Sequence, residues 1–68
     1  MATGVVKWFD SEKGYGFIRP DDGSEDVFVN LTAVTGGPTK APRQNDRVEY
    51  EADARPHGSH ASQVTVVS

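Results

Sequence analysis

Aromatic rings and cations alternate in the first part of the sequence, and this pattern has the clearest chemical potential. The residues concerned are Lys7, Trp8, Lys13, Tyr15, Phe17 and Arg19. Every nucleobase has a flat face that stacks on an aromatic ring, at about 1–3 kcal/mol per base, while lysine and arginine attract the phosphates. The pattern therefore indicates a surface that binds a single strand of nucleic acid with little dependence on base sequence.

Patterns for catalysis or metal binding are weak by comparison. His57 and His60 are three residues apart in a predicted loop, but no cysteine, further histidine or paired carboxylate supplies a third metal ligand. There is no phosphate-binding loop, dinucleotide fingerprint or nucleophile elbow, and nothing orders a serine and a histidine into a nucleophile with its base. We therefore expect no enzyme activity, no metal, no cofactor and no small-molecule substrate.

Length and charge limit the classes of protein to consider. The chain has 68 residues and a formal net charge of −3, which allows one small domain over 1–68. An acidic balance usually argues against a polyanionic partner. The charge is uneven, however, because acidic residues crowd 21–26 whereas 40–47 is net positive, and a net charge does not describe a local surface. The N-terminus lacks an apolar signal-peptide stretch and no apolar run exceeds three residues, which predicts a cytoplasmic protein with no membrane partner.

The elements that must position these residues are strands. Helical periodicity is missing, and short runs rich in Val, Ile, Phe, Thr and Tyr predict an all-β fold. The polar segments 10–13 and 21–24 predict hairpin connections. The segment 35–45 contains Gly36-Gly37-Pro38 and Pro42, so it cannot continue a β-ladder and predicts a long loop. We expect strands at about 3–10, 14–19, 25–30, 46–53 and 60–67.

Side-chain alternation gathers the aromatic residues of the second and third strands on one face. Ile18 shares a face with Gly16, while Tyr15 and Phe17 point the opposite way, and Phe28 opposes two valines in the next strand. Two interpretations remain open. The rings form an exposed binding surface, which the neighbouring cations favour, or both faces of these strands are buried with the rings as core. Gly14 and Gly16, on the face of Ile18, either relieve crowding between the rings or allow the strand to coil sharply.

The fourth and first strands differ in how clearly they separate two faces. Val48 and Tyr50 alternate with charged residues, which is the ordinary pattern of apolar residues inside and polar residues outside. In the first strand, Trp8 shares a face with a valine and an aspartate, and Lys7 shares the other with Phe9. A β-bulge would let Lys7 and Trp8 both reach the face that carries the other rings, but alternation alone does not decide between a regular and a bulged strand.

Three segments of the first half of the chain form a recognisable set. They are Gly4-Val5-Val6-Lys7-Trp8-Phe9-Asp10, Lys13-Gly14-Tyr15-Gly16-Phe17-Ile18 and Asp26-Val27-Phe28-Val29. Together they closely resemble the cold-shock protein family. The second and third look like the family's two ribonucleoprotein motifs, in the same order and spacing, and the resemblance extends over nearly the whole chain. It implies a five-stranded antiparallel barrel of the oligonucleotide-binding type (OB fold). It also implies an RNA chaperone that binds single-stranded RNA or DNA, which we expect to be a monomer.

The resemblance further implies roles for individual residues. The rings Trp8, Tyr15, Phe17 and Phe28 would stack bases, the two lysines would contact the backbone, and Phe9 would flank the stacking rings. Asn30 and His57 occupy two further positions of the implied site. The implied nucleic-acid-binding residues are Lys7, Trp8, Phe9, Lys13, Tyr15, Phe17, Phe28, Asn30 and His57.

The sequence departs from the family's pattern at three places. Asn30-Leu31 stands where a His-Phe pair is usual, and no aromatic residue occurs between Leu31 and Tyr50. His57-Gly58-Ser59-His60 replaces a stretch with a permanent cation. Each lost ring removes about 1–3 kcal/mol of stacking, although such contributions rarely add. We therefore expect weak binding that tightens on acidification, because histidine gains charge near neutral pH.

A second hypothesis is a protein-interaction module, in which the same rings hold a proline-rich peptide or a second copy of the chain. Ionic strength separates the two hypotheses, because phosphate contacts weaken with salt whereas an apolar protein contact is nearly indifferent to it. With few cations among the rings, we expect a shallow salt dependence for nucleic acid.

Overall fold

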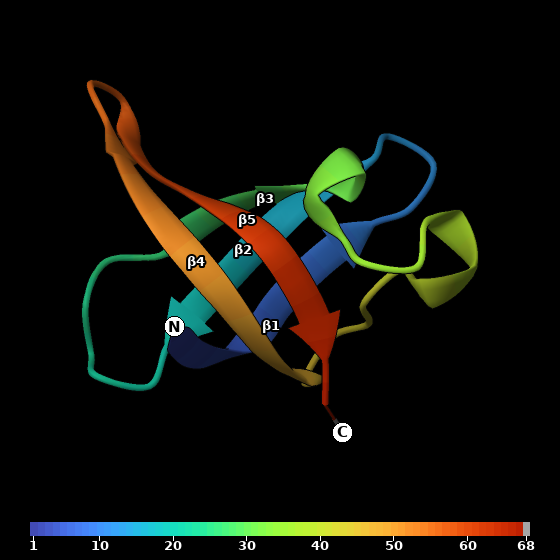
Figure 1. The fold of residues 1–68 in the computed structure, drawn as a ribbon, viewed down its shortest axis with the longest axis horizontal. Helices are drawn as coiled ribbons and strands as arrows, with labels where there is room; N and C mark the ends of the chain where they lie inside the picture. Colours follow the sequence, from blue (N-terminus) through green and yellow to red (C-terminus); the bar gives the residue numbers. More distant parts are fainter. Residues whose placement is uncertain (68) are drawn as a thin grey trace.

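Five strands form a closed barrel in the computed structural model, which describes residues 1–67 (Figure 1). Around the barrel they follow the order β1-β2-β3-β5-β4, and β4 pairs with β1 to close it. The contact of β3 with β5 is parallel, and the other neighbouring pairs are antiparallel. The predicted all-β class and five-stranded barrel are confirmed, while Ser68, the last residue of the predicted domain, lies outside the described residues. The strands are β1 (Ala2–Asp10), β2 (Tyr15–Pro20), β3 (Val27–Asn30), β4 (Arg47–Arg55) and β5 (Gly58–Val66).

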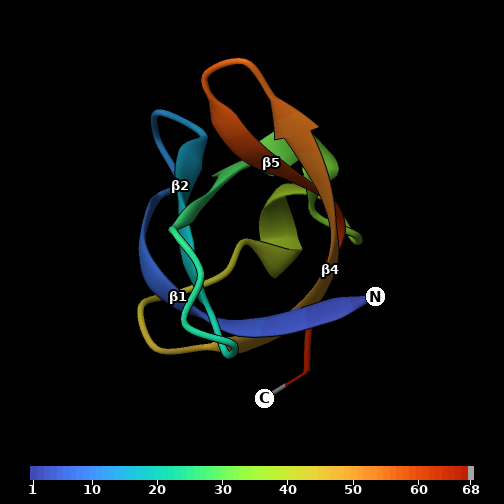
Figure 2. The ribbon, with the colours of Figure 1, turned by 90° about the vertical axis from the view of Figure 1, so that its left-hand side faces the viewer.

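The strands surround a small interior (Figure 2) that is filled mostly by valine. Inward positions recur at every second residue because side chains alternate across a strand. The inward positions predicted for the second and fourth strands, Ile18, Val48 and Tyr50, are all buried. The core therefore forms without the aromatic rings of the first three strands. Its buried residues are Val6, Ile18, Val27, Val29, Val34, Val48, Tyr50, Ala61 and Val64.

The observed strands differ from the predicted ones mainly at their ends. β3 begins at Val27, so the predicted first residues of this strand, 25 and 26, belong to the loop that follows β2. β5 begins at Gly58 rather than at His60, because β4 and β5 are joined by a tight turn in which Arg55 and Gly58 are cross-strand partners. Gly58 has φ +118°, a conformation that favours glycine. His57 therefore lies in the turn and His60 in the strand.

Both predicted hairpin connections join antiparallel neighbours, as expected. At the β1–β2 turn, the Asp10 side chain accepts hydrogen bonds from the backbone N–H groups of Glu12 and Lys13, each at 3.0 Å. Such an aspartate turn replaces the ladder bonds that end at this point. The β2–β3 connection is longer than the predicted 21–24 and continues to Asp26.

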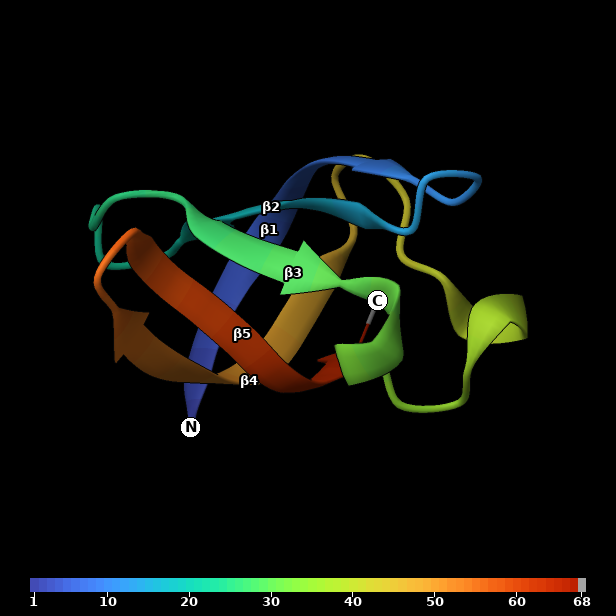
Figure 3. The ribbon, with the colours of Figure 1, turned by 90° about the horizontal axis from the view of Figure 1, so that it is seen from above.

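The long connection between β3 and β4 contains two single-turn 3₁₀ helices, η1 (Leu31–Ala33) and η2 (Pro38–Lys40). Figure 3 shows them at the end of the barrel opposite the β4–β5 turn. Three-residue helices are too short to produce a periodic apolar pattern, so the sequence predicted only a loop here. Val34 anchors the connection, because it is buried and bridges to Val64 of β5. Among residues 1–67, no helix has the length and apolar character needed to cross a membrane.

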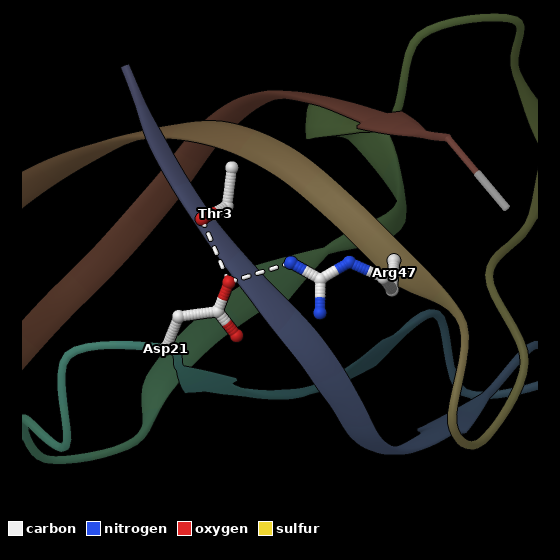
Figure 4. A network of polar contacts seen from close by, with 3 residues as sticks. All are labelled: Thr3, Asp21 and Arg47. Carbon is white, nitrogen blue, oxygen red and sulfur yellow. Dashed lines mark hydrogen bonds and ion pairs between the residues drawn. The ribbon is translucent and has the colours of Figure 1, made fainter.

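A polar contact links three segments that are far apart in the sequence (Figure 4). The Thr3 hydroxyl of β1 donates to the Asp21 carboxylate at 2.8 Å, and the Arg47 guanidinium at the start of β4 donates to the same oxygen at 2.7 Å. These two hydrogen bonds, from Thr3 first and then from Arg47, hold the pKa of Asp21 below its ordinary value. The contact therefore joins β1, the end of β2 and β4 where the barrel closes.

Candidate nucleic-acid interface

A β-bulge at Lys7 sets which residues of β1 face outward. Val6 pairs with Ile18, but the next pair along the strand joins Trp8 to Phe17, so Lys7 is an extra residue on β1. The bulge reverses the alternation after Val6. Trp8 consequently lies on the outer side with Phe17, and Phe9, the next residue of β1, turns inward.

Gly16 allows the two strands to approach closely just after this bulge. It pairs with Phe9, and a Cβ atom added at Gly16 would lie 2.7 Å from the Phe9 Cα and would also collide with the Trp8 carbonyl oxygen. Gly16 is itself buried on the inner side. Of the two roles open from the sequence, the structure supports close approach of the strands, and the ring that an added Cβ atom would also meet, at 2.7 Å, is that of Phe9.

Five rings form a contiguous cluster on the outside of the barrel, hereafter the ring surface. Trp8 contacts Tyr15 and Phe17, with ring centroids 5.4 and 5.5 Å apart. Phe28 lies 5.8 Å from Tyr15 and 5.7 Å from Phe17. The His60 ring lies 5.0 Å from Phe28. These separations are within the range of favourable aromatic pairs. The rings therefore stabilise one another, and they come from four different strands.

Exposure decides between the two interpretations left open by the sequence. Trp8 is 38% exposed, and the other members of the ring surface are partly exposed. Ile18 and Val29, on the opposite faces of β2 and β3, are completely buried. The rings are thus an outer surface over a valine-rich core, and the interpretation in which both faces of these strands are buried is wrong.

Cations lie around the ring surface, but one of them is paired. The Lys7 ammonium contacts the Asp26 carboxylate at 2.9 Å, with both side chains partly exposed to solvent. Lys13 is exposed in the β1–β2 turn, and Arg19 is exposed on the same side of β2 as Phe17. A phosphate can therefore meet Lys13 and Arg19 directly, whereas it competes with Asp26 for Lys7.

Three residues of the implied site do not take part in the ring contacts within residues 1–67. Phe9 turns inward, packs partly against the core and lines a cavity of about 350 Å³ beside the loop that contains Arg43. Asn30 is the cross-strand partner of Tyr15 and is exposed at the edge of the ring surface, where its side-chain oxygen caps η1 by accepting hydrogen bonds from the backbone N–H and the hydroxyl of Thr32. His57 is exposed in the β4–β5 turn, and the ring contacts within residues 1–67 do not include it.

His60 is the member of the ring surface that sequence reasoning missed. Its position depends on the parallel pairing of β5 with β3, in which Phe28 and His60 are partners. That pairing joins residues far apart in the sequence, so no local pattern reveals it. Alternation within β5 did not reveal it either, because the β4–β5 register shifts between Glu49 and Glu51, so that Ala61 and Val64 are both buried although they are three residues apart.

A small β-barrel with aromatic rings and cations on its outer face defines a class of nucleic-acid-binding domain. The family model described as the 'Cold-shock' DNA-binding domain matches residues 2–67. The chain belongs to this family, whose members bind nucleic acid.

Individual relatives agree with this assignment. The chain is 54% identical to the major cold shock protein of Micrococcus luteus, over 96% of this chain and 97% of the relative. It is 43% identical to the cold shock-like protein CspG of Escherichia coli, over 96% of this chain and 93% of the relative. Among solved structures, Drosophila Unr CSD456 matches with a TM-score of 0.76 at 20% identity, over 98% of this chain and 26% of that longer chain. The structural match supports the fold.

Proposed function

We propose that this protein binds single-stranded RNA or DNA by stacking unpaired bases on the ring surface, and that it acts as an RNA chaperone. The observation that carries the proposal is the contiguous cluster from Trp8 to His60 on the outside of the barrel. Large apolar side chains at the surface are a cost to a free protein unless a partner covers them. Flat rings suit a partner with flat faces, and stacking accepts every base.

The chaperone activity follows from competition between stacking and base pairing. A base that lies on Trp8, Phe17 or Phe28 is not available to its pairing partner. Binding to the unpaired form shifts weak hairpins towards that form by mass action, without nucleotide hydrolysis. We propose that the protein acts as a monomer, since each barrel carries a complete ring surface. We also propose that it acts in the cytoplasm.

The phosphates of the bound strand are held by a small number of cations. Lys13 and Arg19 are exposed beside the rings, and Lys7 becomes available when a phosphate displaces Asp26. Each phosphate that is neutralised contributes to the fall of affinity with salt. A small set of cations therefore gives a shallow salt dependence, with stacking as the main source of affinity.

Trp8 fluorescence provides the test, because Trp8 is the single tryptophan and lies on the ring surface. A short pyrimidine-rich strand is titrated at low and moderate salt, with a matching duplex as control. Saturable quenching by the single strand alone, weakened modestly by salt, is the expected result. Absence of quenching at high micromolar strand would overturn the proposal and favour the protein-interaction hypothesis, for which proline-rich peptides and self-association are then tested.

A further inference from the structure

The ring surface contains a row with one ring from each of four neighbouring strands. The row runs from Trp8 on β1 through Phe17 on β2 and Phe28 on β3 to His60 on β5, which is the order of these strands around the barrel. Successive centroids are 5.5, 5.7 and 5.0 Å apart. His60 thus extends the row by one strand beyond the rings that the sequence motifs identify.

The side of His60 away from Phe28 faces β4. Its cross-strand partner there is Asp53, and alternation places Glu51 and Arg55 on the same side of β4, two residues to either side. The nearby charges on the β3 side are those of Asp26, which precedes the strand, and its partner Lys7. Within residues 1–67, no ion pair joins any of these groups to His60. Its ring is half-buried by Phe28 and remains partly open to solvent.

We propose that His60 is a base-stacking residue, and that it makes the affinity for a single strand depend on pH near neutrality, a role in which His57 does not take part. This inference rests on the proposed function and extends the same site. A neutral imidazole offers a flat face to a base in continuation of the row. A protonated imidazole keeps that face and adds a positive charge between the Phe28 ring and the phosphates, and both of these attract a cation.

His57 provides a matched comparison, because it is also a histidine, is three residues away and has no ring contact within the described residues. The protein is compared with the variants His60→Gln, His60→Phe and His57→Gln. A short fluorescein-labelled oligothymidine is titrated with each, and anisotropy gives the affinity at about pH 8 and about pH 6, a range in which histidine changes charge. Circular dichroism at both pH values confirms that each variant is folded.

The variants separate the effect of the His60 ring from the effect of its charge. His60→Gln removes the ring and the charge, and we expect it to weaken binding about fivefold or more at about pH 8 and to abolish the gain on acidification. His60→Phe keeps a ring without a titrating group, so we expect affinity close to that of the parent protein at about pH 8 and no pH dependence. His57→Gln leaves the row of rings intact, so we expect it to keep the gain on acidification.

Three results would overturn the inference. They are parental affinity in His60→Gln at about pH 8, a pH dependence that survives in His60→Gln and disappears in His57→Gln, and an equal loss of affinity in His60→Phe and His60→Gln. All three presuppose a parent protein that binds the strand. A parent protein that binds at neither pH would overturn the proposed function itself. The three results above would overturn only the inference about His60, so the two failures are distinguishable.

Discussion

The outer face of β4 is the opposite of the ring surface in chemistry, although the same barrel carries both. The ring surface presents aromatic side chains with lysine and arginine around them, whereas the outer side of β4 presents Glu49, Glu51 and Asp53. A polyanion is attracted to the first face and repelled by the second. The net charge of −3 therefore says little about binding, because much of the acidity lies where no ring is present.

The difference between the faces originates in backbone geometry as much as in composition. In β4 an unbroken alternation turns Val48 and Tyr50 inward and the carboxylates outward. In β1 the bulge at Lys7 interrupts the alternation and moves Trp8 to the outside. Without the bulge, Trp8 would follow Val6 into the interior and the row of rings would begin at β2.

Removing rings gives the largest expected effect, because stacking is the main difference between the two faces. We expect the double variant Phe17→Ala/Phe28→Ala to lose about 2–4 kcal/mol of binding free energy for a short single strand. The core is made of other residues, so the variant still folds. Anisotropy of a labelled strand measures the affinity, and thermal unfolding checks the fold. Unchanged affinity in a folded double variant would remove the stacking role from these rings.

Crowding the bulge gives the next largest effect, this time on stability. In Gly16→Ala the new methyl group collides with the backbone of Trp8 and Phe9, which cannot move aside as a flexible side chain could. Overpacking of this kind costs about 1–3 kcal/mol. Urea unfolding measures the difference. A Gly16→Ala variant as stable as the parent protein would show that close approach at this position is not what permits the bulge.

The contrast between faces also shows how much could be predicted from the sequence. Alternation in the second, third and fourth strands correctly separated Ile18 and Val48 from Phe17 and Phe28, because these strands are regular and each side chain's face follows from parity alone. The motif resemblance added the closed barrel and the family. The prediction was therefore accurate wherever a local pattern determines the structure.

The remaining features depend on contacts between distant segments. The bulge at Lys7 is a mismatch in the pairing of β1 with β2, so parity within β1 could not choose between its two faces. The place of His60 requires the parallel pairing of β3 with β5. Phe9 was expected beside the stacking rings because it follows Trp8 in the motif, yet the bulge turns it towards the interior.

A smaller effect is expected from neutralising the acidic face. In Glu51→Gln/Asp53→Asn two negative charges are lost from β4, close to the end of the ring row. We expect about two- to fivefold tighter binding of a single strand at low salt and almost none of this gain at high salt, where exposed charges are screened. A gain that is independent of salt would point to a structural change and not to relief of repulsion.

The smallest expected effect concerns the acid stability of the barrel closure. Arg47 is a cation on β4, but its charge is held by Asp21, whose carboxylate also accepts the Thr3 hydroxyl. Because these hydrogen bonds lower the pKa of Asp21 from its ordinary 3.8, the folded state binds the proton less readily than the unfolded state. The carboxylate therefore stabilises the fold fully above pH 3.8, and this contribution disappears as the pH falls through the lower value of the folded state.

Urea midpoints of the parent protein, Thr3→Val and Asp21→Asn test this at about pH 6 and about pH 2.5. Asp21→Asn is expected to be less stable than the parent at the higher pH and to show a smaller deficit at the lower one, with Thr3→Val in between because it removes one of the two hydrogen bonds. A deficit of the same size at both pH values would contradict the assignment. Since histidine responds near neutrality and Asp21 only in acid, acidification first changes binding at the ring surface and only later the stability at β4.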